Sequence, residues 1–407
     1  MKITMISNYI NHHQIPFSNA LFELVGDEYH FIQTEPMEEE RIQMGWGIDA
    51  TTIPYVNFLY EQEYECKRLI AESDILLVGW MEQEELLVDR LKSDKLTIRI
   101  SERLYREGQW KAISPRGLLK KYKDHTSHNK DQVYLLCAGA YVASDFSLVH
   151  AYPNKRFQFG YFPETKRMGW DTLKQGKYDD GKIHLVWAGR FIPLKHPEFV
   201  IRLAKALRQK EENKISSLSS VNSTLQTSEM TGFQCDKFHI HFIGGGEMEE
   251  QLKEEIQEAN LQDEITMYGF LSPTEVREIM EKCHVHLFTS NQLEGWGAVV
   301  NEAMNSGCVE VVNDQVGAAP YLVNHGSNGL LYKKGSYADF EKQVIYLMEH
   351  SEEIAVMAEK AYETIVGQWN AEHAAKELIR FYENWKKGVV DPPKSGPFSV
   401  ASVNNKR

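Results

Sequence analysis

The stretch "TSNQLEGWGAVVNEAMNSGC" (Thr289–Cys308) decides how this 407-residue chain is organised. The mostly apolar run Val285–Phe288 just before it predicts a buried strand. A short loop with Glu294 and two glycines follows, and then a helix that carries Glu302. A strand that passes through such a loop into a helix N-terminus presents unpaired backbone N–H groups and a helix dipole. The two carboxylates, eight positions apart, can therefore grip two ends of one extended, hydroxyl-rich ligand.

Composition and charge narrow the classes of protein. A length of 407 residues and a hydrophobic fraction of 42% predict two domains with sizeable cores. The net charge of −13 argues against nucleic acid as the main partner. Five scattered cysteines without a C-x-x-C pair predict free thiols and no zinc site. The chain starts with a strand pattern, and no apolar run approaches the ~20 residues that span a bilayer, so we expect a cytoplasmic protein.

Strand-like and helix-like segments alternate along most of the chain, which predicts an α/β fold with parallel sheets. The polar segment 174–182, which contains two glycines, is interpreted as a linker. It separates an N-terminal domain, residues 1–173, from a C-terminal domain, residues 182–370. Each is expected to be a Rossmann-like, doubly wound domain that binds ligands at the carboxyl ends of its strands. Within the first domain, residues 131–150 are expected to form two helices.

Two segments do not fit a compact core. Residues 211–237 are rich in Ser, Thr, Asn and Glu, which predicts an exposed, mobile insertion. Residues 389–407 form a tail that we expect to be disordered, and a helical pattern at 371–388 precedes it.

Two cations follow the strand that ends at Gly189. Arg190 comes directly after it, and Lys195 lies five residues later, before a helix. A planar guanidinium and a mobile ammonium on a strand-to-helix loop suit a diphosphate. The alternative is that both are solvated surface cations.

Two further strand ends offer weaker signals. Gly244–Gly246 end one strand and open a helix, which fits either a tight turn or a ligand contact, although the full dinucleotide fingerprint is absent. The segment "YGFLS" ends the next strand at Phe270, where exposed backbone groups could contact a nucleobase. A helix with the capping pattern Ser-x-x-Glu follows at Ser272.

The acidic pair also has an alternative, because glutamates on a helix are often solvated. Three features favour a binding site. Gly-Trp-Gly follows Glu294, Glu302 lies in a helix of small and apolar residues, and the whole unit follows a strand end, as Gly189–Lys195 does.

The pair Glu294 and Glu302 resembles the E-x7-E motif of the GT4-type retaining glycosyltransferases, which have the GT-B fold. The Arg190–Lys195 loop, the glycine turn and "YGFLS" occur in the order and at the spacing of that family. The resemblance covers residues 183–350 and implies two domains that face each other across a cleft and close over the substrates, with helix 371–388 crossing back onto the first domain.

The resemblance also implies residue roles on the donor side. Arg190 and Lys195 would clamp the diphosphate of a nucleotide-sugar and stabilise the leaving group. Glu302 would accept hydrogen bonds from the ribose, and Glu294 would hold hydroxyls of the donor sugar. The remaining candidates would line the same ligand: Gly295, Trp296 and Gly297 through backbone N–H groups, Phe270 against the base, and Gly244 and Gly245 as close backbone contacts.

No metal and no cofactor are expected, because two cations and a helix N-terminus already neutralise the phosphates. Retention in this family is ascribed to same-face attack through a short-lived oxocarbenium-like ion pair, so no carboxylate nucleophile is assigned, unlike in retaining glycosidases.

The N-terminal half departs from the family pattern. Its first loop lacks the usual glycines and places His12, His13 and Gln14 where backbone would approach the phosphates. These side chains either contact donor or acceptor, with His13 as the candidate, or cap a helix that starts at Ile15.

The fourth strand of the family is often followed by a His, and this chain has Glu102 near that place. Glu102 is therefore the candidate for contact with an acceptor hydroxyl, and an ion pair with Arg103 is the structural alternative.

Residues 114–130 combine Leu118, Leu119 and Tyr122 with five cations, Arg116, Lys120, Lys121, Lys123 and Lys130. Such a segment is either a solvated helix face or a peripheral contact with an anionic membrane.

The function expected from these features is the retaining transfer of a sugar from a nucleotide-sugar, most often a UDP-sugar, to a glycan acceptor. By family inference the acceptor is lipid-linked on the cytoplasmic leaflet, as in bacterial surface polysaccharide biosynthesis. A nucleotide-sugar epimerase of the same fold is an alternative, since Glu102, His12 and His13 could serve as acid and base groups. A non-catalytic subunit that binds the donor or a partner is another.

Overall fold

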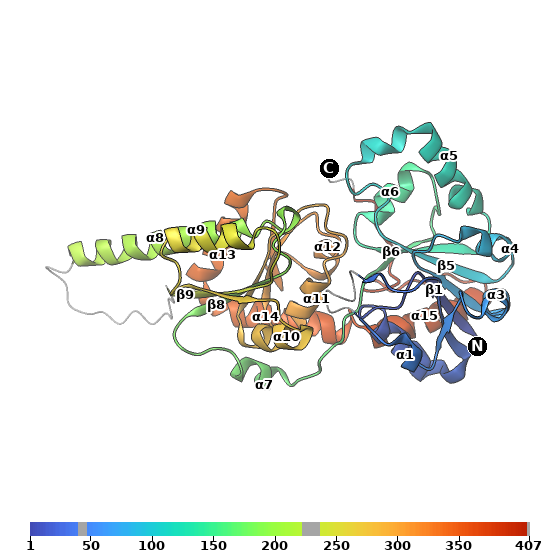
Figure 1. The fold of residues 1–407 in the computed structure, drawn as a ribbon, viewed down its shortest axis with the longest axis horizontal. Helices are drawn as coiled ribbons and strands as arrows, with labels where there is room; N and C mark the ends of the chain where they lie inside the picture. The colour runs from blue at the N-terminus through green and yellow to red at the C-terminus, as the bar shows by residue number, and fades with distance from the viewer. Residues whose placement is uncertain (40–46, 222–236, 405–407) are drawn as a thin grey trace. The chain divides into compact units, whose positions relative to one another are not determined.

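The computed structural model describes residues 1–39, 47–221 and 237–404, and the chain divides into two compact units (Figure 1). The N-terminal unit consists of residues 1–165 and 367–407, and the C-terminal unit of residues 166–366. Each unit is built on one parallel sheet, so the predicted α/β fold with two doubly wound domains is confirmed.

The sheet of the N-terminal unit has seven strands in the order β3-β2-β1-β4-β5-β6-β7 within the described residues. Every neighbouring pair is parallel. The strands are β1 (Ile3–Ser7), β2 (Tyr29–Gln33), β3 (Val56–Phe58), β4 (Ile75–Val78), β5 (Leu96–Ser101), β6 (Val133–Ala138) and β7 (Arg156–Phe159). The helices are α1 (Ile15–Val25), α3 (Glu63–Glu72), α4 (Val88–Leu91), α5 (Pro115–Asp124), α6 (Val142–Leu148) and α15 (Ala371–Lys386).

Helices cover both faces of this sheet. On one face, Leu69 of α3, Leu91 of α4 and Phe146 of α6 pack into a core with alternate strand residues. On the other face, Phe17 of α1 contacts Phe159, and Phe381 of α15 contacts Tyr134 and Phe157. Helix α15 thus belongs to the N-terminal unit, although it lies at the far end of the sequence.

The prediction of two helices for residues 131–150 is wrong for its first half. Residues 133–138 form β6, which is buried on both faces, and only the second half forms a helix, α6. A short, continuous apolar run fits a buried strand and a buried helix equally well, because neither leaves a polar face in the sequence.

The prediction of a disordered tail is wrong for residues 389–404. The chain pairs with β7, where Val400 forms an antiparallel bridge with Phe157 and the amide of Gln158 donates to Ser399 O at 2.7 Å. Phe398 is buried against Phe159 and Phe381. One large aromatic anchor and an open sheet edge are enough to order a segment whose composition is otherwise typical of a loop.

The sheet of the C-terminal unit has six strands in the order β10-β9-β8-β11-β12-β13 within the described residues. All neighbouring pairs are parallel. The strands are β8 (Ile183–Ala188), β9 (Phe238–Ile243), β10 (Ile265–Gly269), β11 (Val285–Phe288), β12 (Val309–Asn313) and β13 (Gly329–Tyr332). The helices are α7 (Trp170–Gln175), α8 (Glu198–Val221), α9 (Glu249–Glu258), α10 (Pro273–Lys282), α11 (Ala298–Asn305), α12 (Ala319–Leu322), α13 (Tyr337–Glu349) and α14 (Ser351–Gly367).

The two faces of this sheet differ in what covers them. Helices α8, α9 and α13 pack on one face through residues such as Leu203, Leu252 and Phe340 (Figure 1). Helices α10 and α11 pack on the other face, where Met280 and Ala303 join a smaller core. The buried polar residues His286 of β11 and Glu310 of β12 also lie on this second face.

The structure moves the boundary between the units from the predicted 173–182 to residues 165 and 166. Helix α7 packs on the C-terminal unit, with Leu173 buried. Lys177 donates from Nζ to the carbonyls of Cys283 (2.6 Å) and Ser306 (2.7 Å). The polar composition of this segment reflects those hydrogen bonds rather than a linker.

The predicted insertion 211–237 begins as helix, because α8 continues to Val221. Residues 222–236 lie outside the described residues.

Candidate functional site

The order of the C-terminal strands places a switch point between β8 and β11. Strand β8 lies beside β11. From β8 the chain continues through β9 and β10 to one edge of the sheet, and from β11 it continues through β12 and β13 to the other edge. In doubly wound sheets, ligands bind at the carboxyl ends of the strands at such a point. The loop after β8 and the loop after β11 both emerge there, and these two loops carry Arg190, Lys195 and Glu294.

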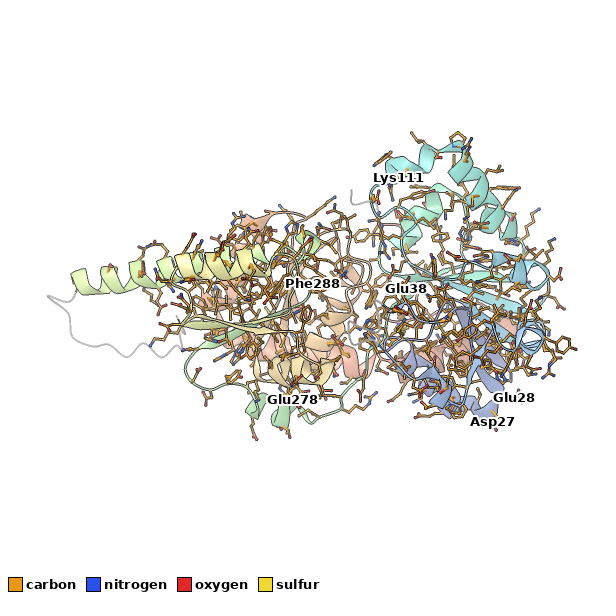
Figure 2. All side chains as sticks on the ribbon, in the orientation of Figure 1. Asp27, Glu28, Glu38, Lys111, Glu278 and Phe288 are labelled. Carbon is orange, nitrogen blue, oxygen red and sulfur yellow. The ribbon has the colours of Figure 1, made fainter. Side chains whose placement is uncertain are left out.

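Lys195 and Glu294 form an ion pair across the switch point. Lys195 Nζ lies 2.6 Å from Glu294 Oε2, and the two side chains are only 15% and 17% exposed. The ammonium also lies 5.5 Å from the centre of the Phe288 ring, at the carboxyl end of β11 (Phe288 is labelled in Figure 2). The structure therefore brings together two predicted site residues that are 99 positions apart in the sequence.

Hydrogen bonds hold the two loops in register beneath this pair. Thr289 donates its hydroxyl to the carbonyl of Lys195 and accepts a bond from Trp187 Nε1 at 2.8 Å. The amide of Asn291 donates to Leu194 O at 3.0 Å. Because the indole and the hydroxyl are buried, these hydrogen bonds fix the backbone of Lys195 beneath its ion pair.

Arg190 lies at the end of the same loop but is exposed. Its neighbour Phe191 is fully buried against Trp187 and Phe242 and anchors the loop. The guanidinium forms no ion pair with Glu294 or Glu302 within the described residues, so the structure brings Lys195, and not Arg190, to the acidic pair.

The loop before α11 has its shape because of Gly297. This residue has φ of +86° and is the N-cap of α11. A Cβ atom there would lie 2.9 Å from Val316 Cγ1 and 3.1 Å from Phe288 Cζ. Both the positive φ and the lack of space therefore disfavour any residue larger than glycine. The backbone N–H groups of Gly295 and Gly297 donate no hydrogen bond to any part of the chain that the structure describes, which leaves them available to an anion or a hydroxyl.

The predicted role of Trp296 is that of its backbone N–H, and its side chain packs inside the C-terminal unit. The indole is buried, and its Nε1 donates to Asn301 Oδ1 at 2.8 Å. The side chain therefore anchors the loop to α11, and only the backbone of Trp296 can face a ligand.

Glu302 lies on α11, more than one turn beyond the N-cap, and is partly buried. Burial raises the pKa of its carboxyl above the ordinary value, and the positive charges of Arg277 and His286 oppose this rise. Within the described residues, its carboxylate accepts no hydrogen bond that would occupy it. Glu302 is thus a carboxyl with nearby cations and unused acceptor capacity.

The glycine turn after β9 has a packing role. A Cβ on Gly244 would lie 1.8 Å from Gly189 O, so the loops after β8 and β9 can meet only because no side chain is present. A Cβ on Gly245 would lie 2.5 Å from Phe270 Cε2. The ring of Phe270 thus lies over Gly245 and is 74% exposed, which leaves it open to a planar ligand.

In the N-terminal unit, Glu102 follows β5 and is held by two partners. Tyr161 donates its hydroxyl to Glu102 Oε1 at 2.5 Å, and Arg106 forms an ion pair with Oε2. The predicted alternative, a pair with Arg103, is wrong. Arg103 binds the buried Asp145, with Nε to Oδ2 at 3.2 Å.

His13 belongs to the same cluster as Glu102. Its ring is stacked on Tyr161, with centroids 5.9 Å apart, and lies 3.9 Å from the ring of His12. Burial, and next the charge of His12, lower the pKa of His13 to about 3. Gln14 is the N-cap residue of α1, as the alternative predicted, but its side chain forms no capping bond, and its Nε2 donates to Ser7 Oγ at 3.3 Å.

Sequence reasoning missed three residues at this end of the N-terminal unit. Tyr161 joins His13 to Glu102, and Asp145 ties down residues 103–109 by accepting from Tyr105 N and Gln109 Nε2. Trp80 follows β4 and is 61% exposed. The sequence signal for Trp80 was a tryptophan that follows the end of a buried strand, where a ligand-contacting residue is expected.

Helix α5 and the 3-10 turn Gln109–Ile113 before it expose apolar side chains. Trp110 is 68% and Ile113 is 79% exposed, and the predicted Leu118, Leu119 and Tyr122 are exposed as well. The ammonium of Lys111, labelled in Figure 2, lies 5.7 Å from the Trp110 ring. Four of the five predicted cations are on α5, and Lys130 follows it. We call this surface, residues 109–130, the α5 patch.

The described residues were compared with two further classes of site, membrane-spanning helices and metal-binding clusters. None of their helices is both long and apolar enough to cross a bilayer. No group of three or more His, Cys, Asp or Glu side chains among them is placed to hold a metal ion.

Comparison with known proteins gives the class of the C-terminal unit. Residues 170–364 match the family described as Glycosyl transferases group 1, which confirms the resemblance inferred from the motifs. Anabaena HepE, solved in complex with UDP, has a TM-score of 0.64 to this chain at 14% identity, over 93% of this chain and 99% of HepE. This likeness extends over both units and shows that the chain has the GT-B fold of such structures.

Two curated relatives match parts of the chain. The chain is 24% identical over 151 residues to the amylovoran biosynthesis glycosyltransferase AmsK of Erwinia amylovora, covering 36% of this chain and 37% of that protein. It is 23% identical over 150 residues to the poly(glycerol-phosphate) alpha-glucosyltransferase of Bacillus subtilis, covering 37% of this chain and 22% of that protein. The matches therefore span little more than a third of these relatives at most.

Proposed function

We propose that this chain is a retaining glycosyltransferase that moves a sugar from a nucleotide-sugar, such as a UDP-sugar, to a glycan acceptor. The observation that carries the proposal is the Lys195–Glu294 ion pair, 2.6 Å long, at the switch point of the C-terminal sheet. The group 1 match over residues 170–364 supports the reaction class. The UDP named with HepE supports the choice of nucleotide.

The donor would lie along the carboxyl ends of β8 to β11. Lys195, with Arg190 beside it, would bind the diphosphate, and Glu302 would accept hydrogen bonds from the ribose hydroxyls. When the phosphates bind the ammonium of Lys195, the carboxylate of Glu294 would be released from its ion pair and would bind the sugar hydroxyls instead. Phe270, over Gly245, would contact the base.

The chemical step breaks the bond between the anomeric carbon and the diphosphate oxygen, and the electron pair leaves with the nucleoside diphosphate. Positive charge on Lys195 and Arg190 and the N–H groups at the start of α11 stabilise this leaving group. The oxygen of the acceptor hydroxyl then bonds to the anomeric carbon on the same face of the sugar, and its proton passes to the departing diphosphate oxygen. In this proposal the protein's own cations and N–H groups neutralise the phosphates, so neither a metal nor a cofactor is needed.

On the acceptor side we propose that Glu102 contacts the incoming hydroxyl and that Tyr161 and Arg106 orient it. His13, whose pKa is lowered to about 3, would act as a neutral hydrogen-bonding group near this carboxylate. The names of the amylovoran and poly(glycerol-phosphate) relatives support a surface polymer as the acceptor class.

The α5 patch supports a lipid-linked acceptor at a membrane surface. Exposed Trp110 and Ile113 would enter the interface, and the basic residues would bind anionic headgroups. We propose that the chain works in the cytoplasm and docks peripherally on the inner face of the cell membrane through this patch.

A panel of nucleotide-sugars tests the proposed function. Binding of the true donor should raise the melting temperature of the chain, since a ligand of the folded state stabilises it. With an acceptor glycan, the same donor should give a product that retains the anomeric configuration, observed by proton NMR. Conversion of the donor sugar without an acceptor would replace the proposal with epimerisation, and binding without any turnover would leave a non-catalytic subunit.

Flotation with phosphatidylglycerol vesicles tests the docking surface. The full chain should float with anionic vesicles and not with phosphatidylcholine vesicles. Substituting Trp110 and Ile113 with Ser should reduce flotation, as should changing the five basic residues to Gln. A matched control is Tyr64→Ser on α3, which removes another exposed aromatic outside the patch. Equal flotation of all variants would reject the α5 patch as the docking site.

A further inference from the structure

A buried histidine–glutamate pair lies beneath the proposed ribose-binding carboxylate. His286 on β11 and Glu310 on β12 are 1% and 0% exposed, and His286 Nδ1 lies 2.9 Å from Glu310 Oε1 and 3.0 Å from Oε2. The other ring nitrogen, Nε2, is buried and forms no hydrogen bond with any described residue. A buried polar atom without a partner is costly, so its presence needs an explanation.

Strand register places this pair on the face that α11 covers. His286 is paired with Glu310 on one side and with Val186 of β8 on the other, so all three side chains point to the same face. Val186 packs with Ala303 of α11, which is the residue after Glu302. His286 therefore lies under the segment of α11 that carries Glu302.

The charged groups around His286 come from three elements. Glu310 lies on β12, Glu302 on α11 and Arg277 on α10, while β8 contributes only the apolar Val186. Arg277 donates to Asn305 Oδ1 at 2.7 Å, one turn after Glu302. Burial raises the pKa of both Glu302 and Glu310, and the charge of His286 opposes the rise in each case. The charge of one imidazole thus acts on both carboxyl groups.

We propose that His286, held by Glu310, is a positioning residue that holds the Glu302 carboxyl group as a hydrogen-bond acceptor for the ribose of the nucleotide-sugar. With Nδ1 bonded to Glu310, the second ring nitrogen of His286, Nε2, is left for the carboxyl group of Glu302 on the helix that covers this face. The carboxylate then remains an acceptor of hydrogen bonds in a partly buried place where it would otherwise take up a proton. This inference rests on the proposed function, because it assigns the ribose to Glu302.

An apolar replacement of the pair separates positioning from packing. The double variant His286→Phe/Glu310→Val fills the same space without charge, and such replacements of buried ion pairs often leave stability unchanged or improve it. Glu302→Gln removes the carboxylate itself, and the triple variant combines all three changes. His241→Phe is the matched control, because His241 is a buried histidine on the same face and at the same level of the sheet, across Val186 from His286.

The probe is UDP, and its Kd is measured by calorimetry on the full chain between pH 6 and pH 9, together with the melting temperature of each variant. At pH 7 the double variant should bind UDP on the order of tenfold more weakly than the parent chain, as should Glu302→Gln. Its affinity should recover toward the parent value as the pH rises, because alkali ionises Glu302 without help from His286. The triple variant should bind no more weakly than Glu302→Gln alone, and the control should stay within about twofold of the parent.

Three results would overturn the inference. A parent-like Kd and pH profile in the folded double variant would make the pair purely structural. Losses that add in the triple variant would show that the pair does not act through Glu302. A parent chain that binds neither UDP nor another nucleoside diphosphate would remove the proposed function, and the inference with it.

Discussion

The two units end their central strands with different chemistry. At the switch point of the C-terminal unit, the loops carry Arg190, Lys195 and Glu294, with Glu302 behind them on α11. At the carboxyl ends of β1 and β5 in the N-terminal unit, burial lowers the pKa of His12 and His13 and raises the pKa of Tyr161, and Glu102 forms an ion pair with Arg106. A diphosphate carries a fixed pattern of charge and demands charged partners, whereas an acceptor hydroxyl needs only a well-placed hydrogen bond. The first kind of site leaves a clear trace in sequence and the second does not.

The largest expected effect comes from the cation at the switch point. Lys195→Ala should reduce turnover by about 100-fold or more, the scale of losing one group that stabilises developing charge. Glu294 would also lose its partner, so the sugar-binding carboxylate would be free to move. Steady-state transfer from the donor found in the nucleotide-sugar panel measures this. Lys205→Ala, which removes an exposed lysine of α8, should leave turnover unchanged. Equal activity of both variants would remove the diphosphate role of Lys195.

Donor affinity should respond next, at Glu302. Glu302→Ala should weaken UDP binding by about 10- to 100-fold, because hydrogen bonds to a charged group are lost. The comparison predicts that Glu102→Ala in the N-terminal unit leaves UDP affinity unchanged. Calorimetry measures the Kd for UDP of both variants. An equal loss of UDP affinity in both would contradict the assignment of nucleotide binding to the C-terminal unit alone.

A smaller effect is expected on the acceptor side. Tyr161→Phe removes the hydroxyl that binds Glu102 and should lower kcat about tenfold, with the KM for the donor unchanged, because the carboxylate loses its orientation. Tyr60→Phe is a suitable control, since its hydroxyl only accepts a long, 3.3 Å bond from Gln33. A rise in donor KM with constant kcat would move Tyr161 to the donor side and contradict the assignment.

The smallest effect at neutral pH concerns histidines that both units bury. Burial is the main cause that lowers the pKa of His241 to about 3 in the C-terminal unit and of His125 to about 2 in the N-terminal unit. Their unfolded counterparts take up protons near pH 6.5, so the stability that these neutral rings contribute is complete above pH 6.5 and is lost as the pH falls toward 3. Each such ring adds about 1.4 kcal/mol per pH unit to the acid dependence of unfolding.

Denaturant unfolding between pH 7 and pH 5 measures this dependence. His241→Phe should reduce the slope of unfolding free energy against pH by about one proton, and His125→Phe should do the same. Unchanged slopes would mean that these rings already bind protons in the folded chain.

Much of the switch point in the C-terminal unit could be predicted from sequence because parallel strands bring consecutive loops to one edge. That rule, together with the family resemblance, predicted that Lys195 and Glu294 share a site, although 99 positions separate them. It could not predict that Trp296 faces inward, because the orientation of one side chain in a glycine loop depends on tertiary partners such as Asn301.

Other features depended on contacts that the sequence does not encode locally. The pairs Arg103–Asp145 and His286–Glu310 join residues 42 and 24 positions apart, and their existence depends on strand register and helix packing. The strand β6 was mistaken for a helix because its apolar run has no periodicity. The tail was mistaken for disorder because one buried aromatic, Phe398, outweighs its composition.

A crystal structure of the full chain with UDP tests the central claim most directly. The account predicts UDP at the carboxyl ends of β8 and β11, with its diphosphate on Lys195 and its ribose hydroxyls on Glu302. UDP bound elsewhere on the chain, or an empty switch point at saturating UDP, would contradict it.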